Sequence, residues 1–206
     1  MIRIFLFLLL TTCITSLYAI NFRLGLMGGT NTSLNQLYTY NDITSTDSKM
    51  GYNANAFARF QFTNYILQPE VGYYINRVGL SVNEVGNSRE CTYISGQMYT
   101  SVLMGFKFSK LNFSIGPMIS FTTNQSFDAL TSQQTMVQQI NEGRATLGAM
   151  VNLGIDISKR WSIDLRANRT FTQSEFNSVI DNKSFNFSGN TGTLSLMIGY
   201  SIFRTP

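Results

Sequence analysis

Two carboxylates come nearest to a catalytic arrangement in this sequence. The chain has no histidine, so it lacks the general base of Ser-His-Asp and Cys-His mechanisms. A pair of carboxylates can perform acid-base catalysis without histidine, and Asp156 and Asp164 lie on consecutive segments of alternating apolar and polar residues. Such segments more often build a barrel wall with a polar interior than an active site. We therefore interpret both carboxylates as structural and expect no enzymatic activity.

Other reactive or ligand-binding features of the sequence are weak. Beyond the N-terminal segment described below, Cys91 is the one remaining cysteine, and a single thiol forms no internal disulfide. Gly28-Gly29 suits a tight or bulged backbone better than a phosphate-binding loop. The 15 Lys and Arg residues are scattered rather than gathered in a basic block. We therefore expect no cofactor, no metal site and no nucleic-acid partner.

Several charged and polar side chains are expected in the interior of the fold. The turn at Thr63-Asn64 sets Arg59 opposite Gln68 and diagonal to Glu70, within reach of a long side chain. Charges in a low-dielectric lumen should be paired or hydrogen-bonded, so we expect an ion pair between Arg59 and Glu70. The expected polar network of the lumen comprises Arg23, Arg59, Gln68, Glu70, Arg144, Asp156, Asp164 and Arg166.

The first 19 residues are predicted to be a secretory signal peptide. Arg3 gives a positive start, residues 4–10 are an uninterrupted apolar run, and Ala19 is a small residue that suits cleavage. An alternative is lipidation at Cys13, although the preceding Thr12 is larger than the residue usual before a lipidated cysteine. The rest of the chain, 20–206, is predicted to be one outer-membrane β-barrel domain, because about 187 residues form one substantial core.

Alternation of apolar and polar residues with a period of two predicts strands along the whole mature chain. In the clearest segment Trp161, Ile163 and Leu165 share one face, and Asp164 and Arg166 share the other. No later apolar run reaches the roughly 18 residues of a transmembrane helix. The predicted strands are 22–30, 50–62, 65–76, 92–108, 111–122, 144–157, 160–172 and 191–203.

The connections between these segments alternate between long and short. The long ones are predicted at 31–49, 77–91, 123–143 and 173–190, and the short ones at Thr63-Asn64, Ser109-Lys110 and Ser158-Lys159. Short periplasmic turns and long external loops are typical of outer-membrane barrels. The sequence thus predicts an all-β fold, an eight-stranded antiparallel up-and-down transmembrane β-barrel with short periplasmic turns and long extracellular loops.

Two local features need separate expectations. Pro69 and Pro117 fall inside predicted strands, where each removes a ladder hydrogen bond, so we expect a bulge or irregularity at both. In the loop 123–143, apolar residues recur at loosely helical spacing, and a short surface helix and an irregular loop are both left open.

Composition and aromatic residues favour a membrane setting. The charged fraction is 13%, about half the usual share of soluble domains. Amphipathic rings favour the membrane interface, and aromatic residues recur near the short-turn ends of the strands, which indicates a periplasmic girdle in contact with outer-membrane lipid. The expected girdle comprises Phe60, Phe62, Tyr65, Phe106, Phe108, Phe113, Trp161 and Tyr200.

Four segments of the chain carry a family resemblance. They are Leu67-Gln68-Pro69-Glu70-Val71-Gly72-Tyr73-Tyr74, Ile115-Gly116-Pro117, Ile163-Asp164-Leu165-Arg166 and Gly199-Tyr200-Ser201-Ile202-Phe203. Through these segments the sequence resembles the PorT-like outer-membrane β-barrel proteins common in Bacteroidetes. The resemblance implies a barrel in the bacterial outer membrane and, from the eponymous member, an association with a secretion and gliding apparatus. Arg204-Thr205-Pro206 departs from the pattern, because barrel assembly signals often end on the aromatic residue itself.

Three functions are left open by the sequence. The first is a non-enzymatic surface barrel whose four external loops contact extracellular ligands. The second is an accessory subunit of a cell-envelope secretion or assembly machine, in contact with envelope-complex proteins. The third is a soluble periplasmic barrel that binds a small apolar ligand, which would need an apolar interior and a polar exterior. The inward Asp164 and Arg166 argue against the third.

Overall fold

The computed structural model describes residues 20–34, 43–84, 87–129, 137–138, 145–172, 174–180, 183–189 and 192–205. The predicted signal peptide, 1–19, lies outside these residues and stays a prediction, and so does the expected lumen position of Arg144. Within the described residues no helix is long and apolar enough to cross a membrane.

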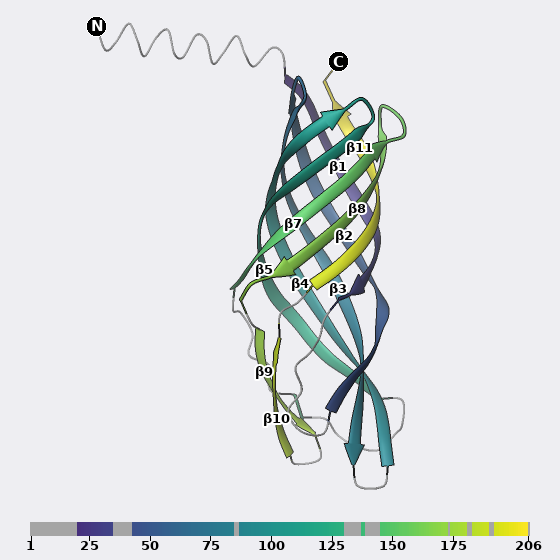
Figure 1. The fold of residues 1–206 in the computed structure, drawn as a ribbon, viewed down its shortest axis with the longest axis vertical. Helices are drawn as coiled ribbons and strands as arrows, with labels where there is room; N and C mark the ends of the chain where they lie inside the picture. The colour runs from purple at the N-terminus through teal and green to yellow at the C-terminus, as the bar shows by residue number, and fades with distance from the viewer. Residues whose placement is uncertain are drawn as a thin grey trace, which may run out of the picture.

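The described strands form a closed antiparallel barrel and a small second sheet (Figure 1). The barrel contains β1 (Ile20–Ser33), β2 (Ile43–Phe62), β3 (Tyr65–Glu84), β4 (Asn87–Phe108), β5 (Leu111–Ala129), β7 (Ala145–Asp156), β8 (Trp161–Thr170) and β11 (Gly192–Arg204). The second sheet contains β6 (Val137–Gln138), β9 (Ser174–Ile180) and β10 (Lys183–Gly189). The predicted eight-stranded up-and-down barrel is confirmed.

The barrel closes where its first and last strands meet. β1 pairs with β2 on one side and with β11 on the other, so that Gly28 lies opposite both Ala54 and Ile198. Closure leaves no strand edge with unpaired backbone groups, which a membrane-spanning sheet requires. The start of β1 and the end of β11 lie at the same end of the barrel (Figure 1). The pairing continues into the last residues of the chain, because the Thr205 amide donates to the Phe22 carbonyl at 2.9 Å.

The faces of the barrel wall follow the predicted alternation. On β8, Ile163 and Leu165 are 38% and 44% exposed, whereas Asp164 and Arg166 are 0% and 2% exposed. The same alternation of exposed and buried positions runs along β7 and β11. The outer surface is therefore apolar, and the polar face points inward, as lipid around the barrel and a packed lumen demand.

The strands are longer than predicted at the end opposite the short turns, so several predicted long loops are wrong. The predicted loop 77–91 is mostly strand, because β3 and β4 stay paired as far as Glu84 and Asn87. Val78, Leu80 and Val82 alternate with Gly79 and Ser81. Their phase is opposite to that of Val71, Tyr73 and Ile75, so the segment did not read as a continuation of the same strand. β2 begins at Ile43 and β5 continues to Ala129, which shortens the predicted loops 31–49 and 123–143.

Strand structure also occupies much of the last two predicted loops. Most of 173–190 forms the β9–β10 hairpin, and β6, inside 123–143, pairs with β9. Within 123–143, Ala129 and Val137–Gln138 lie in strands. Residues 130–136 and 139–143 lie outside the described residues, so the choice there between a short helix and an irregular loop stays open. Figure 1 shows this second sheet and the extended strands at the end of the molecule away from the chain termini.

The strands are irregular at the two prolines, as expected, but no bulge forms. The β2–β3 ladder is interrupted between the pairs Phe57–Glu70 and Phe60–Leu67, and the β4–β5 ladder between Ser101–Met118 and Met104–Ile115. Pro69 pairs with Val102 and Pro117 with Ala149, and the register is unchanged across both prolines. A proline lacks one backbone donor but adds no residue to the strand, so it weakens the ladder without shifting it. The register shifts lie elsewhere, for example between Lys49 and Tyr52 on β2.

Two of the short turns contain residues in the left-handed region. Thr63 has φ 53° and Ser109 has φ 56°, a conformation that is costly for a side chain branched at Cβ, such as that of Thr63. The tight connections between antiparallel strands impose this backbone.

Replacement of Thr63 by asparagine should stabilise the barrel. Asparagine tolerates the left-handed region and lacks the extra backbone entropy cost of glycine, so Thr63→Asn should raise the free energy of unfolding by roughly 0.5–1 kcal/mol. The measurement is urea unfolding of the barrel in lipid vesicles. Asn64→Thr is the matched control and should change stability little, because Asn64 is not in the left-handed region. A lower stability of Thr63→Asn would contradict the proposed strain.

Candidate functional site

The candidate site is the polar network inside the barrel. At the short-turn end, three cations converge on one carboxylate. Asp156 of β7 accepts from Arg23 of β1 at 2.9 Å and from Lys107 of β4 at 2.5 Å. The Arg59 guanidinium of β2 lies 3.4 Å from the other carboxylate oxygen. One side chain thus ties together four strands that lie in different parts of the wall.

Arg59 connects this cluster to the next polar layer. Its Nη2 lies 3.9 Å from Oδ1 of Asp164 on β8, and its Nε donates to Oε1 of Gln68 on β3. Ser162 donates its hydroxyl to the other oxygen of Asp164 at 3.0 Å. Arg59 and Asp164 are 2% and 0% exposed, so each needs these partners to offset the loss of water.

The middle layer contains an ion pair that spans the lumen. Nη1 of Arg166 on β8 lies 3.0 Å from both carboxylate oxygens of Glu70 on β3. Three neutral donors complete the shell of Glu70, namely the Ser101 hydroxyl at 2.9 Å and the Asn55 and Gln68 amides at 3.1 Å. Four hydrogen-bonding groups around one buried carboxylate account for its burial at 4% exposure.

The expected ion pair between Arg59 and Glu70 is wrong. Among the described side chains Glu70 pairs with Arg166, whereas Arg59 pairs with Asp156 and Asp164. Strand register sets Arg59 near Glu70 along the wall, but the narrow lumen brings the opposite wall equally close. A contact across the barrel is invisible to a register argument, which treats two neighbouring strands alone.

The structure thus brings together seven of the eight residues expected in the lumen network, and Arg144 lies outside the described residues. Sequence reasoning missed Lys107, although a signal was present. Lys107 lies between Phe106 and Phe108, which were assigned to the outer face, so strict alternation points it inward. It also missed Asn152, whose carbonyl accepts from Nε of Arg166 at 3.1 Å.

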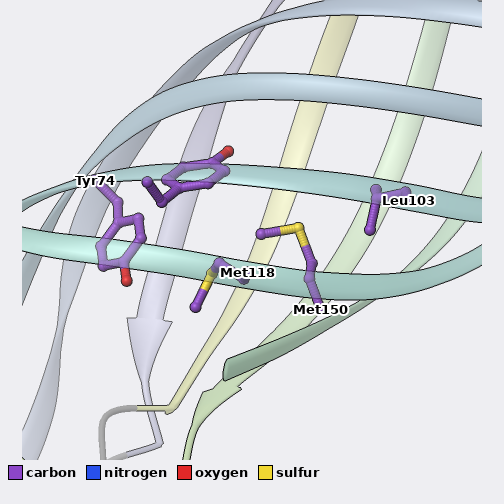
Figure 2. Packing of buried hydrophobic residues seen from close by; sticks show 5 residues of the cluster. Tyr74, Leu103, Met118 and Met150 are labelled. Carbon is purple, nitrogen blue, oxygen red and sulfur yellow. The ribbon is translucent and has the colours of Figure 1, made fainter. Parts of the chain in front are cut away.

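The lumen is not polar throughout, because a cluster of apolar side chains crosses its middle (Figure 2). Leu103 is 0% exposed, Met118 1% and Met150 2%. The Tyr74 and Tyr99 rings lie 5.4 Å apart, and the Tyr74 hydroxyl donates to Oε1 of Gln97 at 2.8 Å. A second buried cluster comprises Met27, Phe57 and Met197. Side chains therefore fill the barrel, as the diameter of eight strands allows.

This arrangement gives both candidate carboxylates cationic partners. Asp156 and Asp164 are both engaged by cations, so neither stands as an uncompensated acid or base facing an open cavity. Among the described residues no group of three or more Cys, Asp or Glu side chains could hold a metal ion.

The aromatic residues expected in the girdle lie on the outer wall near the short turns. Tyr65 and Phe106 have ring centroids 5.0 Å apart, and those of Trp161 and Tyr200 are 4.8 Å apart. Six of the eight residues are exposed by 40% or more, and Phe60 and Tyr200 are half-buried. Phe22, which faces Phe60 across β1 and β2, extends the row.

Removal of one partner of the cross-lumen ion pair should destabilise the barrel strongly. Arg166→Met leaves the Glu70 carboxylate buried without its countercharge, which costs about 3–5 kcal/mol. Urea unfolding in lipid vesicles, followed by tryptophan fluorescence, measures the loss. The double variant Glu70→Gln, Arg166→Met should recover part of it, because neither charge then remains.

Arg160→Ala is the matched control for this experiment. It removes an exposed arginine that donates to the Tyr200 hydroxyl at 3.0 Å, and it should cost less than about 1 kcal/mol. Equal losses for Arg160→Ala and Arg166→Met would show that the lumen pair has no special weight.

Comparisons with known proteins concern the whole barrel. The model of a family described as "Outer membrane protein beta-barrel domain" matches residues 15–175. No curated protein sequence matches the chain. Solved structures similar to it include Neisserial surface protein A, 11% identical, with TM-score 0.46 over 87% of this chain and 97% of that chain.

Two further solved structures show similar values. The outer membrane protein AlkL is 14% identical, with TM-score 0.47 over 87% of this chain and 90% of that chain. The attachment invasion locus protein Ail of Yersinia pestis, in complex with the heparin analogue sucrose octasulfate, is 16% identical, with TM-score 0.44 over 88% and 99%. The family model, unlike these distant likenesses, covers most of the chain. The protein therefore belongs to the outer membrane protein beta-barrel domain family and lies in the bacterial outer membrane.

Proposed function

We propose that the protein is a non-enzymatic surface barrel that holds an extracellular sheet for contact with molecules outside the cell. The observation that carries the proposal is the contrast between the two parts of the chain. The membrane-spanning part is filled by ion pairs and apolar side chains, whereas the strands continue well beyond it at the extracellular end. A barrel whose interior is filled by side chains is better suited to support an extracellular structure than to act as a channel.

The extracellular part has its own regular structure. β3 and β4 stay paired to the tip of their hairpin, and β4 pairs with β5 as far as Cys91 and Ala129. Above the membrane, β9 and β10 pair over seven residues. Strand-paired surfaces offer a binding partner a more fixed shape than irregular loops do, which lowers the entropy cost of binding.

The buried network supports a structural reading of the motif that carries the PorT-like resemblance. Gln68 and Glu70 point into the lumen, where they bond Arg59 and Arg166. A segment with such partners has a role in holding the barrel together, so its presence does not by itself favour secretion. PorT-like membership and the role of an accessory subunit of an envelope machine remain the alternative proposal. The soluble periplasmic barrel is set aside, because the exposed wall is apolar.

A lumen filled by side chains has a direct electrical consequence. The purified protein in planar lipid bilayers should give no resolved conductance steps, because apolar side chains such as Leu103, Met118 and Met197 are buried in the lumen. A porin inserted under the same conditions is the positive control. Stable, voltage-independent conductance steps from this protein would contradict the proposal of a structural support and favour a transport role.

The contact role is tested by removal of the β9–β10 hairpin. A variant that joins residues 172 and 192 through a short Gly-Ser linker should still show the heat-dependent gel mobility of a folded barrel. Cells that make it should lose most of the adherence to immobilised matrix proteins and glycans that cells with the full chain show. A deletion of the same hairpin that leaves adherence and surface binding unchanged contradicts the proposal. Recovery of an envelope complex by cross-linking would then favour the alternative.

A further inference from the structure

The outer wall of the barrel is uneven where β1 and β2 meet. Most outward side chains are Leu, Ile, Phe or Met, but Gly28, Ala54 and Ala56 lie side by side and leave the wall thin. The resulting hollow has a volume of about 570 Å³ and an almost wholly apolar lining. Ile198 and Val71 are among the residues that form its sides. A second hollow of about 410 Å³ follows along β1.

The two hollows form one line along the strand. Gly28 floors the first hollow and Thr30, the next outward residue, lines the second. Leu196 and Ile198 are successive outward residues of β11 and border the second and the first hollow respectively. The second hollow is still mainly apolar, but its lining also contains hydroxyl groups, among them those of Thr32 and Ser48, 2.8 Å apart.

Two cations follow on β2 and β3: Lys49 comes directly after Ser48, which lines the second hollow, and neither cation lines a hollow itself. Lys49 and Arg77 are register partners on β2 and β3, an arrangement of like charges that destabilises a sheet unless an anion offsets it. The Arg77 guanidinium lies 5.8 Å from the centre of the Tyr52 ring, on the outer wall, and Lys49 donates to the Thr92 hydroxyl at 2.6 Å.

No anion among the described side chains offsets these charges. The described carboxylates that form ion pairs bind Arg23, Arg59, Lys107 and Arg166 in the lumen. Nε of Arg77 is buried and has no hydrogen-bond partner. Among the described side chains the pair thus lacks an anionic partner and keeps an unused donor, which an anionic group would complete.

The position of the hollows and of the two cations along the barrel axis indicates which part of the membrane surrounds them. Phe62 of the periplasmic girdle and Tyr52 are ten residues apart on β2. This is about 33 Å along the strand and, at a tilt of about 40°, about 25 Å of height, which is the height of the apolar band of such barrels. Gly28 and Ala54 lie within this band. Lys49 and Arg77 lie just beyond it, on the extracellular side, at the depth of the headgroups of the outer leaflet.

We propose that this line of hollows and the cation pair together bind one outer-leaflet glycolipid, with an acyl chain along the groove and a phosphate on Lys49 and Arg77. Both parts of the site match the two parts of such a molecule, in the right order from the membrane interior outward. The cation pair distinguishes this occupant from a second copy of the chain, for which an apolar groove alone would be sufficient.

The site is tested with lipid A as the probe. The full chain, folded in detergent, is mixed with bisphosphorylated lipid A or with its dephosphorylated form, and native mass spectrometry measures the retained lipid. The unaltered protein should retain one bisphosphorylated molecule and bind the dephosphorylated form on the order of tenfold more weakly, because each cation near a phosphate contributes about 1 kcal/mol.

Two variants probe the two halves of the site. Lys49→Gln with Arg77→Gln should weaken the bisphosphorylated form on the order of tenfold and leave the dephosphorylated form unchanged. Ala54→Leu fills the groove from its floor and should weaken both forms. The matched controls are Arg169→Gln, an exposed cation on β8, and Ala149→Leu, a small outward residue on β7; neither lines the hollows.

The outcomes separate the proposal from its rivals. Heat-dependent gel mobility first establishes that each variant is folded. Equal weakening by the control and site variants, or no weakening by either site variant, overturns the proposal. A dimer in the unaltered protein that Ala54→Leu abolishes also overturns it, because the groove is then an interface between copies of the chain.

Discussion

The alternation of side chains along each strand is the constraint on which the rest of this structure depends. In a strand, successive residues point to opposite sides, and in a closed membrane barrel one side meets lipid and the other a narrow lumen. A slip of one residue would put Arg166 into hydrocarbon and Leu165 into the lumen. Both the apolar wall and the charged interior therefore follow from one register.

The charges of the lumen make that register specific. Asp156 bonds cations from three other strands, and Glu70 meets Arg166 across the barrel. Buried ion pairs add little stability relative to well-packed apolar residues, but a buried charge without its partner is costly. Any pairing of strands that separated these groups would leave such charges exposed to a low dielectric. The network therefore acts mainly against wrong arrangements of the wall.

The same geometry leaves function to the surfaces that the barrel presents. The interior is filled, so the binding surfaces available are the extended strands outside the membrane and the lipid-facing wall. The proposed contact sheet uses the first, and the proposed glycolipid site uses the second. The two proposals depend on different residues, so either can hold without the other.

The sequence by itself determined the fold class, the number of barrel strands, the short turns and the direction in which most side chains point. These features are local, because period-two alternation and turn residues are properties of neighbouring positions. The prediction of a loop at 77–91 was wrong. The segment was interpreted as a loop because it contains many polar residues, but most of it continues β3 and β4. Pairing with a neighbouring strand satisfies the backbone there, and no local property reports that pairing.

Only the tertiary structure decided which charged side chains form ion pairs and where small residues leave a hollow in the outer wall. Arg59 was assigned the wrong partner because the distance across a closed barrel depends on the curvature of all its strands. The apolar cluster around Leu103 and the groove over Gly28 arise in the same way, from side chains that are far apart in the sequence. The sequence pattern determines to which side of the strand a residue points, but the closure of the sheet determines which side chains it contacts there.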